Sequence, residues 1–99
     1  MLFGVIYKPH PGLDEQGENR ALQLFANWQP PQGFELRAHY FRADGNGGII
    51  LVEADSAEAL GEAIAPFTPF FHYDASPVID AEAGVPILQR TTEWRSSVR

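Results

Sequence analysis

Hydrophobic positions along the chain change their period from two to about four and back, which predicts alternating strands and helices. Residues 2–8 form an almost continuous run of β-branched and aromatic residues. The Pro-His-Pro-Gly sequence that follows ends a predicted strand, which we expect to be buried on both faces. Over residues 14–28 acidic residues come first and apolar residues then recur at helical spacing, so we expect a helix there.

The middle of the chain has the pattern of a β-hairpin. In residues 34–42 apolar side chains alternate with mostly polar ones, and this period of two indicates a strand. The glycine-rich residues 44–48 tolerate the positive φ angles that hairpin loops require. Residues 49–53 are apolar again and predict the returning strand.

A second helix, a fourth strand and a tail complete the chain. Asp55 or Ser56 is suited to cap a helix whose apolar stripe ends at Pro66. Residues 70–79 predict a further strand. The tail, residues 83–99, begins with a glycine-proline break and is compatible with a helix or an arm, packed on its own subunit or on a partner subunit.

The element order βαββαβ predicts a ferredoxin-like α+β domain over residues 1–82. Right-handed crossovers place the four strands in one antiparallel sheet, with both helices on one face. The other face is left uncovered, yet apolar residues fill both alternating sets of residues 2–8 and 49–53. Because such apolar patches mark interfaces, we expect a homodimer through the uncovered sheet face, a dimeric α+β barrel with an internal cavity.

Polar side chains on the uncovered face indicate what such a cavity would contain. Strict alternation places five of them there, from three different strands: Arg37, His39, Glu53, His72 and Asp74. A mostly apolar cavity with a few convergent polar groups is the usual form of a small-molecule site. We therefore expect these five residues to bind a small, partly apolar ligand.

The same residues also suit an enzyme, which we keep as an alternative. His39 beside Asp74 or Glu53 could act as a general base, and Arg37 could hold a carboxylate or enolate oxygen. The protein would then be a cofactor-independent enzyme of the isomerase or monooxygenase type. A further alternative is a structural or interaction domain without a ligand, in which ordinary cross-strand ion pairs occupy these positions.

Three histidines raise the question of a metal site. Topology brings His10 and His72 to one edge of the sheet, and His39 would have to join them from the middle of a strand. Their spacing fits no common ligand motif, and the chain has no cysteine. We therefore predict no metal and no cofactor.

Composition narrows the partners and the location. Thirteen acidic against seven basic residues give a net charge of -6, which argues against nucleic acid and anionic membranes as partners. No apolar stretch approaches the roughly 18 residues of a membrane span, and the first residues lack the features of a signal peptide. The absence of cysteine fits a reducing cytoplasm, where we expect the protein to reside.

Several segments resemble a family of short, uncharacterised bacterial proteins. The longest is GGIILVEADSAEAL, residues 47–60, accompanied by residues 28–33, 66–67 and 76–80. That family is assigned to the dimeric α+β-barrel superfamily, which includes cofactor-independent monooxygenases, muconolactone-type isomerases, haem-dependent peroxidases and ligand-sensing domains. The resemblance covers residues 1–82 and implies the fold and a homodimer, but it implies no particular reaction.

Overall fold

Four strands and three α-helices make up the chain, all 99 residues of which are described by a computed structural model. In chain order the elements are β1 (Leu2–Pro9), α1 (Glu15–Ala26), β2 (Phe34–Phe41), β3 (Gly48–Ala54), α2 (Ala57–Ile64), the short 3-10 helix η1 (Ala65–Phe67), β4 (Phe71–Pro77) and α3 (Ala81–Ser97). The predicted order βαββαβ is confirmed, and α3 follows it. None of the helices combines the length and the apolar character that crossing a bilayer requires.

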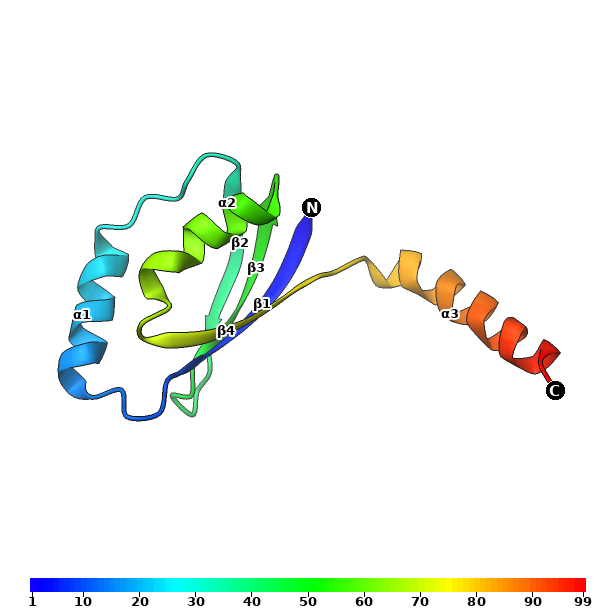
Figure 1. Ribbon diagram of the computed structural model, residues 1–99, viewed down its shortest axis with the longest axis horizontal. Coiled ribbons are helices and arrows are strands. Elements are labelled where there is room, and N and C mark those ends of the chain that lie inside the picture. The colour runs from blue at the N-terminus through cyan, green and yellow to red at the C-terminus, as the bar shows by residue number, and fades with distance from the viewer.

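The strands form one antiparallel sheet in the order β2-β3-β1-β4, with α1 and α2 on the same side of it (Figure 1). This is the ferredoxin-like α+β fold that the sequence predicts. Both helices begin at a capping side chain, and Ser56 is one of the two capping residues predicted for the second helix. Asp14 accepts a hydrogen bond from the Gly17 N–H at 2.8 Å, and Ser56 accepts one from the Ala59 N–H at 3.1 Å. These bonds satisfy N–H groups that the first turn of a helix leaves unpaired.

The core lies between the sheet and α2. Eight buried residues form it: Phe3, Val5, Tyr7, Ile50, Val52, Ala54, Ala59 and Leu60. Alternate residues of β1 and β3 therefore face the helices, as the period of two predicts. Helix α1 differs, because Ala21 is its only buried residue and Leu22 is 63% exposed. The apolar stripe of α1 is thus not packed tightly against the sheet.

A β-bulge in β2 changes which of its residues face the helices. The pairing of β2 with β3 skips Arg37, which has no residue opposite it. A slip of one residue moves every later side chain of a strand to the other face. His39 therefore lies opposite Ile50, a core residue, and faces the helices. The prediction that His39 lies on the uncovered face is wrong for this reason.

Helix α3 projects from the rest of the molecule (Figure 1), and none of its residues is buried. The molecule is 58 Å long, and its Cα radius of gyration is 17.4 Å, against about 13 Å for a compact chain of about 100 residues. The expected break at Gly84 and Pro86 is not observed, since α3 runs through both residues. The tail is thus helical, and it forms an arm.

Candidate functional site

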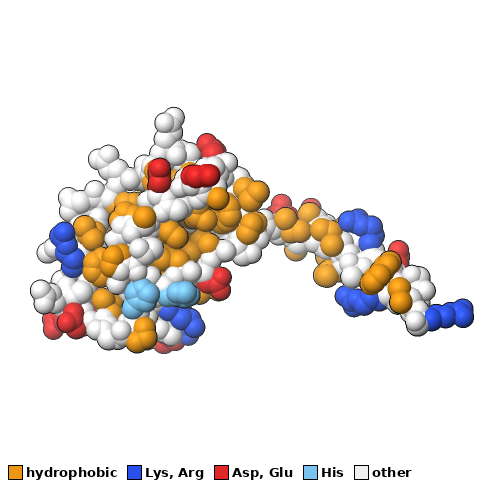
Figure 2. Space-filling view, viewed as in Figure 1, with side chains coloured by type: hydrophobic (Ala, Val, Ile, Leu, Met, Phe, Trp, Pro, Cys, Tyr) orange, Lys and Arg blue, Asp and Glu red, His pale blue; other side chains and the backbone are white.

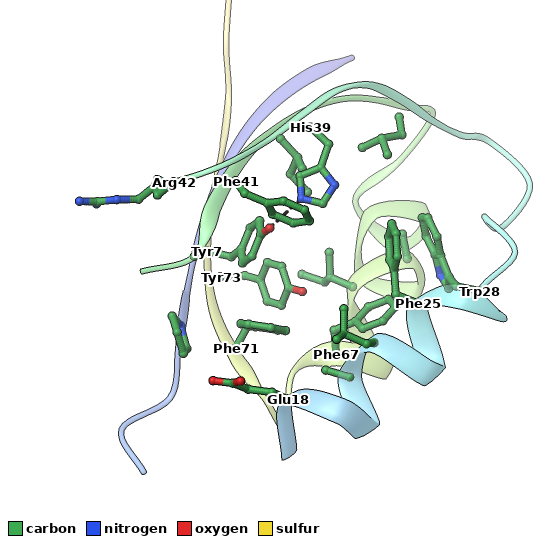
Figure 3. Close-up of a pocket in the computed structure, with 18 of the residues that line it drawn as sticks. Tyr7, Glu18, Phe25, Trp28, His39, Phe41, Arg42, Phe67, Phe71 and Tyr73 are labelled. Atoms are coloured by element: carbon green, nitrogen blue, oxygen red, sulfur yellow. Dashed lines mark hydrogen bonds between the residues drawn. The ribbon is translucent and has the colours of Figure 1, made fainter. Parts of the chain in front are cut away.

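An open cleft of about 470 Å³ separates α1 from the sheet. Helix α1 contacts η1, and its apolar residues Leu22 and Phe25 face the cleft instead of a protein core. Side chains from all four strands form the opposite wall. Figure 3 shows aromatic rings from both walls around this space. The lining is predominantly hydrophobic, as is typical of a small-molecule site.

Aromatic rings line the cleft from wall to wall. On the sheet side, the ring centroids of Tyr7 and Tyr73 are 5.7 Å apart. On the helix side, Phe25 stacks on Trp28 with centroids 6.1 Å apart. The imidazole of His39 connects the two sides, with its centroid 5.6 Å from that of Tyr7 and 6.0 Å from that of Phe25. Such stacked and edge-to-face geometries suit a further aromatic ring.

The main polar feature of the cleft is a hydrogen bond between β1 and β2. The hydroxyl oxygen of Tyr7 lies 2.7 Å from Nε2 of His39 (Figure 3, dashed line). Burial raises the pKa of Tyr7 and lowers the pKa of His39, so both groups are neutral near pH 7. The bulge at Arg37 creates this pair, because it turns His39 toward the helices.

Two polar groups of the cleft have no partner within the protein. No hydrogen bond of the structure involves the Tyr73 hydroxyl or Nδ1 of His39. Both atoms remain accessible from the cleft, because the structure contains no buried side-chain polar atom that lacks a partner. Burial, together with the neighbouring Tyr7, raises the pKa of Tyr73, so its phenol keeps its proton. A protonated phenol can donate or accept a hydrogen bond. Both groups are therefore available to a ligand.

The structure does not gather the five residues that the sequence pattern assigns to one site. On the uncovered face, Nε of Arg37 lies 3.6 Å from a carboxylate oxygen of Glu35. Glu53 accepts a hydrogen bond from the amino group of Met1 at 2.7 Å, and this bond lowers the pKa of Glu53. Arg37 and Glu53 thus already have partners within the protein.

His72 and Asp74 lie at the other edge of the sheet, on β4. Two strands separate β4 from β2, so Arg37 is about 14 Å away from β4 across the sheet. His39 lies on the opposite face, hydrogen-bonded to Tyr7. The suggested acid–base pair of His39 with Asp74 or Glu53 is therefore not assembled within one chain.

His10 and His72 approach each other as the topology predicts, with ring centroids 6.5 Å apart. Nε2 of His10 is 2.8 Å from the carbonyl oxygen of Thr68. No third side chain of a ligating type joins them, and no such group of three forms elsewhere in the structure. The proximity of His10 and His72 is explained by their packing at the edge of the sheet, where His10 also bonds to the chain preceding β4.

Sequence reasoning missed the residues that define the cleft. The sequence pattern places Phe25 on the apolar stripe of its helix and Tyr7 on a strand with two apolar faces. Alternation along residues 70–79 places Phe71 and Tyr73 in the set that packs against the helices. These side chains do face the helices, but the position of α1 leaves part of each open to the cleft. The amphipathic pattern of α1 predicts that the apolar side of this helix contacts other apolar groups. It does not specify whether those groups belong to the sheet or to a ligand.

The position of His39 makes stability depend on pH. Because burial lowers its pKa in the folded protein, the unfolded chain binds a proton first, near the ordinary histidine pKa of about 6.5. The free energy of unfolding should therefore fall as the pH drops below about 6.5. When the free energy of unfolding is measured with urea between pH 7.5 and 5.5, it should decrease less with falling pH for His39→Gln than for the wild type. The same pH dependence of the free energy of unfolding in both proteins would contradict this role of His39. The control is His72→Gln, which changes a histidine on the other face of the sheet.

Fold and cleft together define a small ferredoxin-like α+β protein with an aromatic cleft between its first helix and the sheet. The chain belongs to a family described as a domain of unknown function (DUF3303), whose model matches residues 1–92. The match extends beyond residue 82 and includes most of α3. No curated protein matches the chain. The family carries no assigned activity, so the function has to be inferred from the cleft.

Proposed function

We propose that this protein binds a small, planar, neutral aromatic molecule that carries a hydroxyl or carbonyl group. The observation that supports this is the cleft of about 470 Å³, which has aromatic walls and two unpaired polar groups. Contacts with Tyr7 and Phe25 would supply most of the affinity. Hydrogen bonds to Tyr73 and His39 would orient the ligand.

A neutral ligand fits the charges better than an anion does. The two tyrosines and His39 are neutral near pH 7, and the chain has a net charge of -6. The one basic side chain that lines the cleft is Arg42, whose Nε already donates to Asp44 at 3.0 Å. A ligand carboxylate would therefore have to compete with Asp44.

Binding without turnover is the activity that this cleft supports best. The enzyme hypothesis needs a neutral histidine that a carboxylate orients, and the carboxylate then stabilises the imidazolium formed when the histidine accepts a proton. Here the partner of His39 is a neutral phenol, and Asp74 and Glu53 lie on the other face. The hypothesis of a ligand-free structural domain is less well supported, because the space between α1 and the sheet is open.

We also propose that the protein forms a homodimer through the uncovered face of the sheet. On this face Ile6 lies opposite Ile49, and Ile49 lies opposite Tyr40, so a continuous apolar band crosses β1, β3 and β2. Ile6 and Ile49 are about half exposed in the single chain, and Tyr40 is 68% exposed. Adjacent exposed apolar side chains are typical of an interface, which supports a second copy as the cover.

Removing the Tyr73 hydroxyl should weaken ligand binding selectively. We expect isothermal titration calorimetry with 2-naphthol to give one site per chain. Tyr73→Phe should lower this affinity by up to about tenfold, because a neutral hydrogen bond contributes about 1 kcal/mol. Naphthalene has no hydroxyl group, so it should bind the wild type and the variant equally.

A matched control comes from the same strand. Ser76→Ala removes a hydroxyl from the uncovered face of β4 and should leave 2-naphthol binding unchanged. The proposed function fails if neither naphthalene nor 2-naphthol binds the wild type. Equal affinities of Tyr73→Phe and the wild type for 2-naphthol would remove Tyr73 from the site.

A further inference from the structure

Helix α3 carries an apolar stripe that nothing in the chain covers. Ile87 and Trp94 are seven residues apart, which places them on one side of the helix, and Val98 directly follows its last residue, Ser97. Trp94 is 66% exposed, and the other two are also exposed. Figure 2 shows hydrophobic and basic side chains side by side along the projecting helix. This stripe is therefore available for contact with a partner.

An isolated helix with the sequence of α3 is marginal in water. Isolated helices of this length are only weakly stable even with favourable residues, and α3 also contains Gly84 and Pro86. Most helical stability in proteins comes from packing an apolar face. A stable α3 therefore needs a surface against which its apolar side chains can pack.

The uncovered sheet face has the complementary composition. Its centre is the apolar band that includes Ile6 and Ile49. Of the acidic side chains beside this band, Glu35 and Glu53 are paired with Arg37 and the amino group of Met1, whereas Asp74 on β4 makes no ion pair. The face therefore suits a partner with an apolar centre and a basic side chain that can reach Asp74.

Helix α3 carries basic side chains beside its apolar stripe. By helical geometry Arg90 and Arg95 lie on either side of the stripe that contains Ile87 and Trp94. Residues 1–80 carry eleven acidic and four basic side chains, whereas residues 81–99 carry three basic and two acidic ones. The length of α3 also matches the length of the sheet. Its 17 residues span about 25 Å, and the eight residues of β1 span about 26 Å.

We propose that α3 crosses to a second copy of the chain and packs the stripe that contains Ile87 and Trp94 on the uncovered sheet face of that copy. The second copy does the same in return, so the exchange is symmetric and closed. The start of α3 favours a second copy over its own sheet. Val78 continues β4 by donating a hydrogen bond to the carbonyl of Leu2 at 3.0 Å, and the chain then leads α3 away from the body (Figure 1). This proposal rests on the proposed homodimer and names the segment that covers the sheet.

Light scattering on full-length variants tests the exchange of α3. The wild type should have a mass of about 22 kDa, twice the 11.0 kDa of one chain. Trp94→Asp should raise the dissociation constant of the dimer at least about 30-fold, as expected for a central tryptophan, and Ile49→Asp should do the same from the sheet side. Gln89→Asp, on the opposite side of α3, is the control and should remain a dimer. Circular dichroism of each variant verifies that the body is folded.

The outcomes separate this inference from the homodimer itself. A monomeric wild type overturns both proposals. If Ile49→Asp is monomeric while Trp94→Asp remains a dimer, the exchange of α3 is refuted, and the two sheets pack directly as a closed barrel. If Trp94→Asp is monomeric while Ile49→Asp remains a dimer, α3 docks elsewhere, and its placement on the sheet is refuted.

Discussion

Replacing Val52 with Asp is expected to unfold the protein at neutral pH. Val52 lies in the middle of β3, fully buried, with Phe3 and Leu36 opposite it on the two neighbouring strands. The core contains no buried charged or polar residue that could pair with the new carboxylate. An unpaired buried charge removes a large part of the roughly 5–15 kcal/mol that stabilises a small domain. The far-ultraviolet circular dichroism of Val52→Asp should therefore lack the native spectrum at 25 °C.

Ile49→Asp is the matched control for this substitution. Ile49 lies three residues earlier on the same strand, faces the opposite side of the sheet and is 50% exposed. We expect this variant to keep the native spectrum and to lose only the dimer. A native spectrum and cooperative thermal unfolding of Val52→Asp near the wild-type melting temperature would contradict the described core.

Gly47→Ala should cost about 3 kcal/mol or more of the free energy of unfolding. Gly47 has a φ of 90°, a conformation that disfavours any residue with a side chain. A Cβ atom at this position would also overlap the carbonyl oxygen of Tyr7 and approach the Cα of Lys8 to 2.9 Å. Backbone atoms of a paired strand cannot move aside cheaply, so strain and overlap add. Urea unfolding measures this loss.

Gly45→Ala separates the two causes. Gly45 has a similar φ of 77°, but a Cβ atom there would meet nothing within 4 Å. Only the backbone strain applies, so we expect a loss of about 1 kcal/mol. Equal losses for the two variants would refute the close contact between the hairpin and β1. Gly47→Ala should also weaken 2-naphthol binding, because it displaces Tyr7 at the wall of the cleft.

The fold could be predicted because each element carries its own local signals. The caps at Asp14 and Ser56, the glycine hairpin and the alternation in β1 and β3 are all short-range patterns. Once four strands and two helices are assigned in the order βαββαβ, the preference for right-handed crossovers leaves one simple arrangement of the strands in an antiparallel sheet. The continuous α3 was not predictable in this way, because Gly84 and Pro86 are unfavourable inside a helix.

The candidate site was misplaced because one residue changes the phase of β2. Strict alternation puts Phe34 and Phe41 on opposite faces, whereas both line the cleft on the helix side. An unbulged strand fits the same residues, with Phe34 and Tyr40 on one face and Phe41 on the other, so the sequence gives no sign of a bulge. The bulge at Arg37 moves His39 to Tyr7, and no sequence pattern indicates that contact.

The open cleft depends on how far α1 stands from the sheet. The apolar stripe of α1, which includes Leu22 and Phe25, has the same sequence pattern whether the helix packs directly on the sheet or is separated from it by a cleft. In the structure α1 meets η1, where the ring of Phe67 lies 6.2 Å from that of Phe25. That contact joins segments about 40 residues apart in the sequence, and no local pattern specifies it.

The most direct test of the account is a nuclear magnetic resonance titration of the assigned wild-type protein with 2-naphthol. We predict saturable shifts in the side-chain signals of Tyr7, Phe25 and Tyr73, which line the cleft. The methyl signals of Ile6 and Ile49, on the uncovered face, should remain unchanged. Shifts confined to Ile6 and Ile49, or no saturable shifts at all, would contradict the assignment of the cleft as the binding site.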